Sequence, residues 1–276
     1  MDTKLIGKSV SDYFCFNQRG GRIFSALDSK FQHCAGIQCE EYYVPGLIDA
    51  ETIKKCGYFE TFPQNLTIAA PVSSSCYAST VCTEKNISQN LEYKRRFFTP
   101  AACLHFYPML ENMSISKETA LTTRARVYRY ESGNFDNMTR LWDFTVRELL
   151  FVGTPDYVRK QLQFVSNWAT NFANRFGPAT LQWANDHFYP TKRNLALENI
   201  QRNSAVKSEL QVNYKQHTIS LASFNYHGFH FSKLFNFDSN GTIASGCVGF
   251  GLERWCAFCS ETTLSFEELI DEIKRN

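Results

Sequence analysis

The alternation of apolar and polar residues divides the chain into helices and strands, with no internal repeat. From Arg22 to Ala35, apolar side chains recur every three or four residues, which predicts an amphipathic helix. The following segment, Glu40 to Val44, is typical of a strand, and Pro45 ends it because proline cannot donate a ladder hydrogen bond. Residues 57–90 are rich in turn formers and predict loops with short strands.

Strict alternation in residues 124–131 and 143–152 predicts an antiparallel hairpin, with GNFDN supplying the turn. A helix follows over residues 155–176, for which Thr154 is the expected N-cap and Pro155 the first residue. Further strands are predicted over residues 209–212 and 217–224.

The C-terminal part combines a glycine-rich strand with two helices. Gly246 to Gly251 predicts a strand that runs into a helix beginning at Leu252. Ser265 and Glu268 form the capping-box pattern of a last helix over residues 265–275. We therefore expect one α+β domain over residues 1–276.

Composition narrows the class of protein. The chain has 276 residues, of which 43% are hydrophobic and 20% charged, as in ordinary globular proteins. No apolar run is long enough for a membrane span, and the N-terminus lacks a hydrophobic signal segment, so we expect a cytoplasmic protein. A net charge of +2 is too small to indicate a nucleic-acid surface.

Ten cysteines are scattered along the chain, and in a reducing compartment most are expected to be buried as small apolar residues, with a few available for metal. Three pairs are close in sequence: Cys34/Cys39, Cys76/Cys82 and Cys256/Cys259. The last pair falls in a predicted helix without a second CxxC, so core packing is the favoured interpretation.

The hairpin carries polar side chains that suit a nucleotide. Arg129 and Glu131 are two residues apart and should share a strand face, opposite Phe144 on the partner strand. A guanidinium fork suits a phosphate, and a carboxylate can accept from an exocyclic amine, so a nucleotide could lie over Phe144. The alternative is an ordinary cross-strand salt bridge on a solvated sheet.

Glu148 falls in the apolar row of its strand, where a carboxylate is unfavourable unless it is paired or binds metal. An arginine such as Arg126 or Arg147 is the commoner partner, and zinc is the rarer one. Cys103 and Cys247 could complete a zinc site, but their wide separation leaves this open.

Two other segments offer groups for a ligand. Gly249 and Gly251 would let a ligand approach the backbone, and Arg254 follows them at a helix start. In SFNYHGFHF the spacing of His227 and His230 differs from that of zinc proteases, so we expect both histidines to be buried and hydrogen-bonded.

Taken in order, these segments resemble the signature of class II aminoacyl-tRNA synthetases. Helix 22–35 with EEYYVP is similar to motif 1, RVYRYE through RLWDFTVRELLFVG to motif 2, and GCVGFGLERW to motif 3. The resemblance implies an antiparallel sheet flanked by helices, and a homodimer formed through motif 1.

Within that class, the chain resembles the amino acid:carrier protein ligases, truncated homologues of atypical zinc-containing seryl-tRNA synthetases. The segments that carry this resemblance are TPAACLHFYP, RELLFVGTP, WANDHFYP, SFNYHGFHF and GCVGFGLER. It implies that Cys103, Glu148 and Cys247 hold Zn²⁺ with one position open for the substrate amino group, and that Ser223 and Asn225 contact the amino acid.

The same resemblance assigns the ATP site. Arg129 would bind the α-phosphate and Glu131 the adenine amine, while Phe144 and Arg254 would enclose the base and Arg140 would reach the terminal phosphates. No carboxylate that could bind Mg²⁺ stands directly before the Ser-x-Asn segment at Ser223, so the magnesium ligands stay unassigned.

The resemblance implies that a small amino acid (glycine, alanine or serine) is activated as an aminoacyl adenylate and transferred to the phosphopantetheine thiol of an acyl carrier protein. No segment resembles the tRNA-binding domain of seryl-tRNA synthetases, so tRNA is the less expected acceptor. Transfer to a tRNA, a peptide or a small molecule is one alternative. An inactive, dimeric binding module is another, although intact Arg129, Glu131, Glu148 and Arg254 argue against it.

Overall fold

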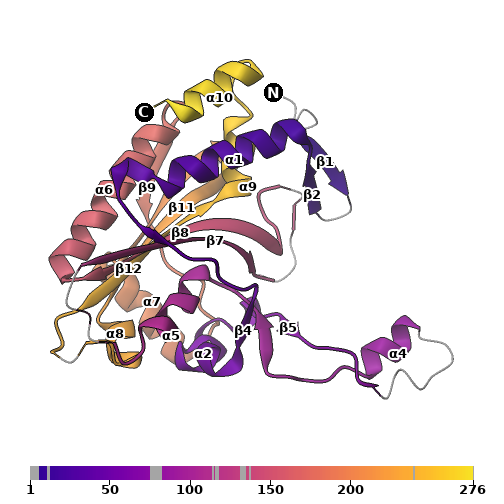
Figure 1. Ribbon diagram of the computed structural model, residues 1–276, viewed down its shortest axis with the longest axis vertical. Helices are drawn as coiled ribbons and strands as arrows, with labels where there is room; N and C mark the ends of the chain where they lie inside the picture. Colours follow the sequence, from indigo (N-terminus) through magenta and orange to yellow (C-terminus); the bar gives the residue numbers. More distant parts are fainter. Residues whose placement is uncertain are drawn as a thin grey trace.

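A seven-stranded sheet is the centre of the computed structural model, which describes residues 6–10, 13–74, 83–113, 115, 118–130, 135–136, 138–238 and 240–275. The strand order is β3-β7-β8-β12-β11-β10-β9 (Figure 1). Their bounds are β3 Glu40–Glu41, β7 Thr119–Tyr128, β8 Asp143–Gly153, β9 Ala179–Trp183, β10 Lys207–Tyr214, β11 His217–Gly228 and β12 Ala244–Gly251. All neighbours are antiparallel except β3 and β7, which are parallel.

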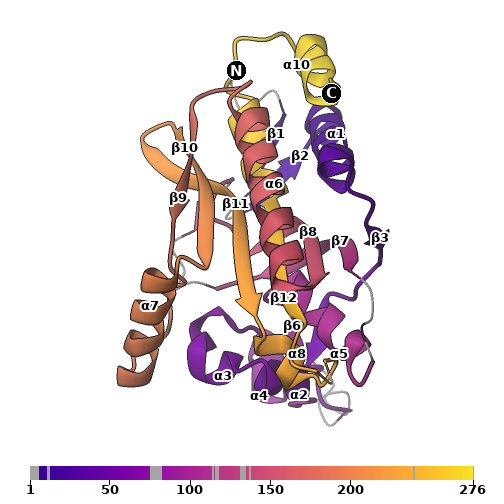
Figure 2. The same ribbon diagram turned by 90° about the vertical axis from the view of Figure 1, so that its left-hand side faces the viewer.

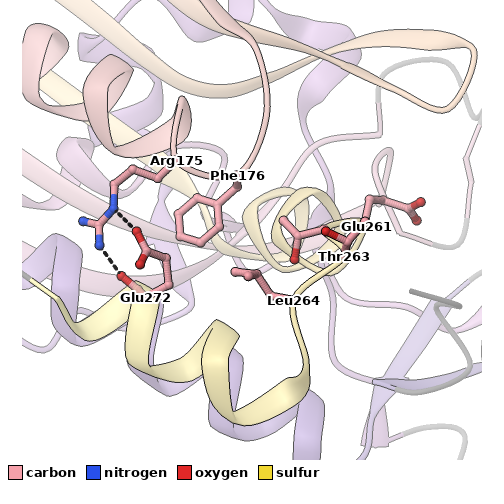
Figure 3. Close-up of a pocket in the computed structure, with 7 residues that line it drawn as sticks. Arg175, Phe176, Glu261, Thr263, Leu264 and Glu272 are labelled. Carbon is pink, nitrogen blue, oxygen red and sulfur yellow. Dashed lines mark hydrogen bonds and ion pairs between the residues drawn. The ribbon is translucent and has the colours of Figure 1, made fainter.

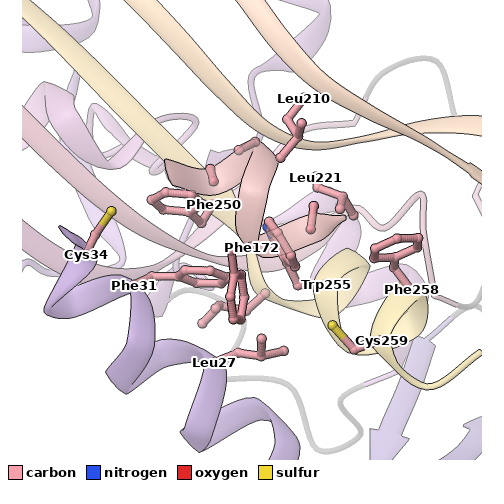
Figure 4. Packing of buried hydrophobic residues seen from close by; sticks show 14 of the residues in the cluster. Leu27, Phe31, Cys34, Phe172, Leu210, Leu221, Phe250, Trp255, Phe258 and Cys259 are labelled. Carbon is pink, nitrogen blue, oxygen red and sulfur yellow. The ribbon is translucent and has the colours of Figure 1, made fainter. Parts of the chain in front are cut away.

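Long helices cover one face of this sheet (Figures 1 and 2). They are α1 Gln18–Gln32, α6 Pro155–Ala173, α9 Leu252–Cys259 and α10 Phe266–Lys274. Phe31 of α1 stacks on Phe250 of β12 with ring centroids 4.4 Å apart, and Phe172 and Trp255 pack against the same ring of Phe31 (Figure 4). Full burial of each such side chain stabilises the fold by roughly 1.5–3 kcal/mol.

Shorter elements cover the opposite face (Figure 1). They are α2 Ala50–Lys55, α3 Tyr58–Thr61, the 3-10 turn Ala102–His105, α5 Phe106–Leu110, α8 His230–Leu234 and the small sheet of β4 Leu47–Asp49, β6 Arg96–Phe98 and β5 Ile68–Ala69. Because side chains alternate along β8, Leu149 and Phe151 join the helix-covered core, whereas Leu150 and Val152 join this second core.

The remaining elements lie at the edges of the molecule. The hairpin of β1 Gly7–Val10 and β2 Tyr13–Phe16 precedes α1, α4 Glu84–Gln89 lies on an arm that projects from the body, and α7 Lys192–Ser204 follows the edge strand β9 (Figures 1 and 2). Short 3-10 turns span Cys34–Gly36 and Pro63–Asn65. Among the helices that the structure describes, none has the length and apolar character needed to cross a membrane.

Most long elements agree with the sequence-based predictions. The hairpin of β7 and β8 forms as predicted, and its register pairs Val127 with Phe144. Thr154 caps α6 by accepting a hydrogen bond from the Tyr157 backbone, and both arms of the Ser265/Glu268 capping box are present. The glycine-rich strand β12 runs directly into α9 as predicted.

The boundaries of α1 differ from the prediction. The helix begins at Gln18 because Asn17 accepts a hydrogen bond from the Gly20 backbone, and it ends at Gln32 before a 3-10 turn. Gly20 interrupts the apolar pattern that was used to place the start. Glycine is required there, since a Cβ would lie 2.1 Å from the carbonyl oxygen of Ile6.

Three further differences concern the smaller elements. The strand predicted over residues 40–44 is only two residues long and parallel to β7, so the sheet carries one parallel edge strand. Residues 57–90 include the helices α3 and α4 in addition to loops and strands. The predictions did not include β9 and α7, because β9 is mostly exposed and α7 has no clear apolar face.

Candidate active site

Three buried side chains from different parts of the chain meet at the second core, on the face of the sheet that the shorter elements cover. Cys103 lies in the 3-10 turn before α5, Glu148 on β8 and Cys247 on β12. Their ligand atoms all lie within 4.8 Å of one another. Two thiols and a carboxylate are a donor set suited to zinc, and three protein ligands leave one position of a tetrahedral site for substrate.

The register between β8 and β12 creates this group. Cys247 pairs with Leu150, and Gly249 pairs with Glu148, so both functional side chains project from the same face. Gly249 leaves room for the carboxylate, since a Cβ at this position would lie 3.0 Å from Glu148 Oε2. The glycine that was predicted to admit a ligand therefore also makes space for Glu148.

Burial raises the pKa of each of the three groups, and so favours its protonated form when no metal is bound. It raises the pKa of Glu148 to about 7, against hydrogen bonds with the two cysteines and the positive charge of Arg129. The pKa of Cys247 is raised by its hydrogen bond to Cys103 and by burial. A hydrogen bond with Cys247 lowers the pKa of Cys103, but burial and the nearby Glu148 outweigh this effect, so the pKa is raised overall.

The two arginines considered as partners of Glu148 pair with other carboxylates. Arg147 is buried on the opposite face, where its guanidinium lies 2.8 Å from Asp28 and 2.7 Å from Glu41. Arg126 forms an ion pair with Asp143. The alternative in which Arg126 or Arg147 neutralises Glu148 is therefore wrong.

Side chains of β11 lie against Cys247. The amide Nδ2 of Asn225 is 3.6 Å from Cys247 Sγ and 3.3 Å from Ser223 Oγ. Nε2 of His227 is also 3.6 Å from Cys247 Sγ, and its Nδ1 is 3.0 Å from the hydroxyl of Tyr107. Asn225 and Ser223 thus lie next to the Cys–Glu cluster, and their contact with substrate stays a prediction.

The structure confirms some of the predictions for the two histidines and the paired cysteines and contradicts one. His227 is hydrogen-bonded as expected, but His230 is exposed at the start of α8, so its predicted burial is wrong. Cys256 and Cys259 are buried in the helix-covered core, which confirms packing as their role. Cys34 also packs in that core, whereas Cys76 and Cys82 lie outside the described residues.

Arg129 follows β7 directly and lies near the cluster. Its Nε donates to the carbonyl of Pro100 at 2.8 Å, and its guanidinium carbon lies 5.5 Å from the ring centroid of Phe144. Its charge lowers the pKa of Glu148, which places the two groups within electrostatic range. Glu131, the predicted adenine contact, lies outside the described residues.

Arg254 joins the hairpin loop to β11. Its Nε donates to the carbonyl of Thr139 at 2.6 Å, and its Nη1 donates to the carbonyl of Ser220 at 3.0 Å. Arg140 is exposed in the same loop, where its backbone N–H donates to Asp136. The structure thus places Arg254 and Arg140 at the hairpin loop, and Arg129 and Phe144 where the strands β7 and β8 meet that loop.

A polar group on β10 was missed in the sequence. Glu209 pairs with Ser223 across the strands, accepts a hydrogen bond from Ser220 and lies 3.1 Å from Lys207 Nζ. Lys207 also lies 2.6 Å from Asp186. Burial opposes ionisation of Glu209, but Lys207 and Ser220 lower its pKa overall, and Arg254 adds to this effect. A charged residue inside the predicted strand 209–212 was the available signal.

A separate surface groove lies among α6, α10 and the segment after α9, on the helix-covered side of the sheet (Figure 3). Its Arg175 donates to the Glu272 carboxylate at 2.5 Å and to the Glu272 carbonyl at 2.6 Å. The groove and the Cys–Glu cluster are on opposite faces of the sheet, so the groove adds nothing to the cluster.

Comparison with curated proteins finds distant relatives, although no protein-family model matches the sequence. The type-2 serine–tRNA ligase of Methanococcus aeolicus is 24% identical over 241 residues, covering 79% of this chain and 46% of that protein. The amino acid–[acyl-carrier-protein] ligase 1 of Bradyrhizobium diazoefficiens is 26% identical over 233 residues, covering 76% of this chain and 67% of that protein. The chain spans about half the length of the serine–tRNA ligases that it matches.

Solved structures agree on the fold. M. kandleri seryl-tRNA synthetase, solved with A. aeolicus tRNASec, gives a TM-score of 0.81 at 20% identity, covering 96% of this chain and 58% of that chain. The cytoplasmic serine–tRNA ligase of Naegleria fowleri, in complex with AMP, gives a TM-score of 0.68 at 12% identity, covering 94% of this chain and 60% of that chain. The chain therefore has a class II synthetase-like core, as the motif order predicted.

Proposed function

We propose that this protein uses ATP to activate glycine, alanine or serine as an aminoacyl adenylate, and transfers the aminoacyl group to the phosphopantetheine thiol of a carrier protein. The observation that supports this most strongly is the buried cluster of Cys103, Glu148 and Cys247 beside Arg129, within a class II synthetase-like core. Relatives that are amino acid or serine ligases support the reaction class.

The cluster fits zinc on the chemistry of its donors. A buried carboxylate with a raised pKa, next to two buried thiols, is unfavourable unless a cation compensates for the loss of solvent. When bound, zinc would hold the α-amino group of the substrate at its open position. Asn225 and Ser223 lie at the same end of the site and are our candidates for orienting that amino acid.

The ATP site is proposed on the hairpin side of the cluster. Arg129 is our candidate for the α-phosphate, Phe144 and Arg254 for the base, and Arg140 for the terminal phosphates. The assignment of Glu131 to the adenine amine has the same basis in the motif resemblance. Mg²⁺ would accompany ATP, and our candidate ligand for it is Glu209. Its carboxylate accepts a hydrogen bond from Ser220, and the charge of Arg254 contributes to lowering its pKa.

The first step of the proposed chemistry needs no general base, because a carboxylate is already a nucleophile. A substrate carboxylate oxygen attacks the α-phosphorus of ATP, a P–O bond forms and pyrophosphate leaves. The carrier thiol then attacks the activated carbonyl, a C–S bond forms, AMP leaves and the thiol proton passes to solvent. Arg129 would stabilise the charge that develops at the α-phosphate in the first step, and positioning would supply much of the remaining rate.

We favour a carrier protein as acceptor because the curated carrier-protein ligase is matched over 67% of its length, against 46% for the M. aeolicus serine–tRNA ligase. The tRNA ligases among the relatives make tRNA the second candidate. A homodimer through α1 and β3 is also proposed. Tyr43, two residues after the end of the edge strand β3, is 85% exposed, and a second copy could cover it.

The decisive experiment is ATP–pyrophosphate exchange with each of the twenty amino acids, followed by mass spectrometry of candidate carriers and by tRNA charging. We expect exchange with glycine, alanine or serine, about one zinc per chain, and loss of both metal and exchange in Cys247→Ser. Cys259→Ser, a core cysteine on α9, is the matched control and should keep both. A zinc-free protein that forms adenylates at the normal rate would refute the zinc assignment, and absence of exchange with every amino acid would refute the proposed activity.

A further inference from the structure

We propose that His227 is a positioning residue for Cys247: its Nε2–H donates a hydrogen bond to the sulfur, and Tyr107 holds the ring in that tautomer. This inference rests on the zinc site proposed above and adds a residue to it.

The geometry gives each ring nitrogen a partner. Nε2 lies 3.6 Å from Cys247 Sγ, and Nδ1 lies 3.0 Å from the Tyr107 hydroxyl and 3.3 Å from Ser245 Oγ. The imidazole also packs nearly perpendicular to the ring of Phe231, with ring centroids 5.1 Å apart. Phe231 in turn stacks on Tyr107, with centroids 3.8 Å apart. These contacts fix the plane of the imidazole, so its hydrogen bonds have defined directions.

The protonation of the ring follows from its partners once Cys247 is a thiolate. A metal-bound sulfur has no proton to donate, so a hydrogen bond with Nε2 requires the proton to be on the nitrogen. A neutral ring then has an unprotonated Nδ1, which accepts from the hydroxyl of Tyr107 or Ser245. Tyr107 is fully buried, so its hydroxyl has a strong need for such an acceptor.

Charge explains why the sulfur needs this donor. Two thiolates and a carboxylate place three negative charges around a cation that carries two, in a buried site. Hydrogen bonds from neutral donors offset the excess without adding another charge. Asn225 Nδ2 approaches the same sulfur at 3.6 Å, so β11 presents two N–H donors to Cys247. Groups that hydrogen-bond to metal ligands orient them and tune the metal.

Cobalt substitution tests the proposal without using catalytic activity. In the protein loaded with Co²⁺, the energy of the thiolate-to-cobalt charge-transfer band reports hydrogen bonding to sulfur. His227→Phe removes the donor and keeps a ring, whereas His227→Gln keeps an N–H donor near Nε2. His230→Gln is the matched control, because His230 is exposed three residues further on.

We expect the band to move to lower energy in His227→Phe, with Co²⁺ binding weakened by about 10–100-fold. His227→Gln should restore most of both properties, and His230→Gln should match the wild type. A purely structural role would lower the melting temperature of His227→Phe but leave the band energy of the folded fraction unchanged. A folded His227→Phe with wild-type band energy and affinity overturns the proposal.

A second measurement keeps the test valid if His227→Phe does not fold. Nitrogen-15 NMR of the zinc-loaded wild type should show the proton of His227 on Nε2, and a proton on Nδ1 alone overturns the proposal. A wild type that binds neither cobalt nor zinc would overturn the zinc site together with this inference. Missing amino acid exchange in a protein with the expected metal spectra would count against the proposed activity alone.

Discussion

Two buried ionisable side chains, Arg147 and Glu148, are neighbours on β8 and point to opposite faces of the sheet. The Arg147 side chain is 2% exposed and is enclosed by Asp28 and Glu41, while Arg124 adds a second cation at Asp28. Glu148 is 6% exposed and lies among two thiols, under the influence of Arg129. Arg147 is matched by carboxylates of α1 and β3, whereas Glu148 lies beside the two cysteines with which we propose that it binds zinc.

Burial has different consequences for the charged forms of these two side chains. Hydrogen bonds to Asp28 and Glu41 raise the pKa of Arg147 despite its burial, so its charged form is the stable one. Burial raises the pKa of Glu148 toward neutrality, so its charged form needs a further cation. The ion pairs of Arg147 therefore stabilise the fold without any ligand. The cluster around Glu148 would instead be stabilised by a bound cation.

The largest expected effect concerns the ion network. Arg147→Met should lower the free energy of unfolding by about 3–5 kcal/mol, because it leaves the carboxylates of Asp28 and Glu41 in place without their buried cation. Urea unfolding of the zinc-loaded protein would measure this. Arg95→Met removes a solvent-exposed ion pair with Glu51 and should lower the same quantity much less. Equal effects of the two substitutions would contradict the distinction.

Replacing Glu148 by glutamine should have the opposite effect on the free energy of unfolding of the metal-free protein. The raised pKa of Glu148 means that the folded state binds its proton more tightly, so this contribution to stability is complete below about pH 4.5 and is lost as pH rises through about 7. Above pH 7, Glu148→Gln should therefore be more stable than the wild type by up to about 3 kcal/mol.

Urea unfolding in the presence of a chelator, from pH 4.5 to pH 8.5, measures this difference. With zinc present the order should reverse, because metal binding requires the ionised carboxylate and stabilises the wild type. A difference between Glu148→Gln and the wild type that does not change with pH would show that Glu148 does not titrate in this range, and would remove the contrast with Arg147.

A third substitution tests whether Arg254 belongs to the catalytic side of the comparison. Arg254→Ala should reduce kcat/KM in ATP–pyrophosphate exchange by roughly 30-fold, about 2 kcal/mol of transition-state stabilisation, with little loss of metal. Arg254→Lys should recover only part of this, because lysine lacks the planar fork. Arg193→Ala, at an exposed arginine of α7, is the control. Unchanged exchange in Arg254→Ala would refute the nucleotide assignment.

The smallest expected effect tests the space above Glu148. Gly249→Ala places a Cβ 3.0 Å from Glu148 Oε2, so the carboxylate must shift, and zinc binding should weaken by roughly tenfold. The control is Gly46→Ala, where the added Cβ meets no atom within 4 Å. Competition with a zinc chelator would measure both. Wild-type affinity in Gly249→Ala would show that the carboxylate position is not critical.

The sequence by itself determined the elements whose pattern is long and local. The period of apolar residues gave α6 and the β7–β8 hairpin, and local caps such as Thr154 and the Ser265/Glu268 box fixed helix ends, because these interactions join residues only a few positions apart. The order of the three motifs gave the class II synthetase-like fold. Glu148 was also identifiable, since a carboxylate in an apolar row is unusual wherever the strand lies.

Only the tertiary structure decided what each charge and thiol meets. The 3-10 turn at Cys103 brings this residue to Glu148 and Cys247. Because side chains alternate along β8, Arg147 points to the other face of the sheet, where it meets Asp28. Glu209 meets Ser220, and His227 reaches Cys247, through strand registers with irregularities after Leu210 and Tyr226. Such contacts join residues far apart in the sequence or depend on a bulge, and the period of side chains along one strand carries no information about its partner.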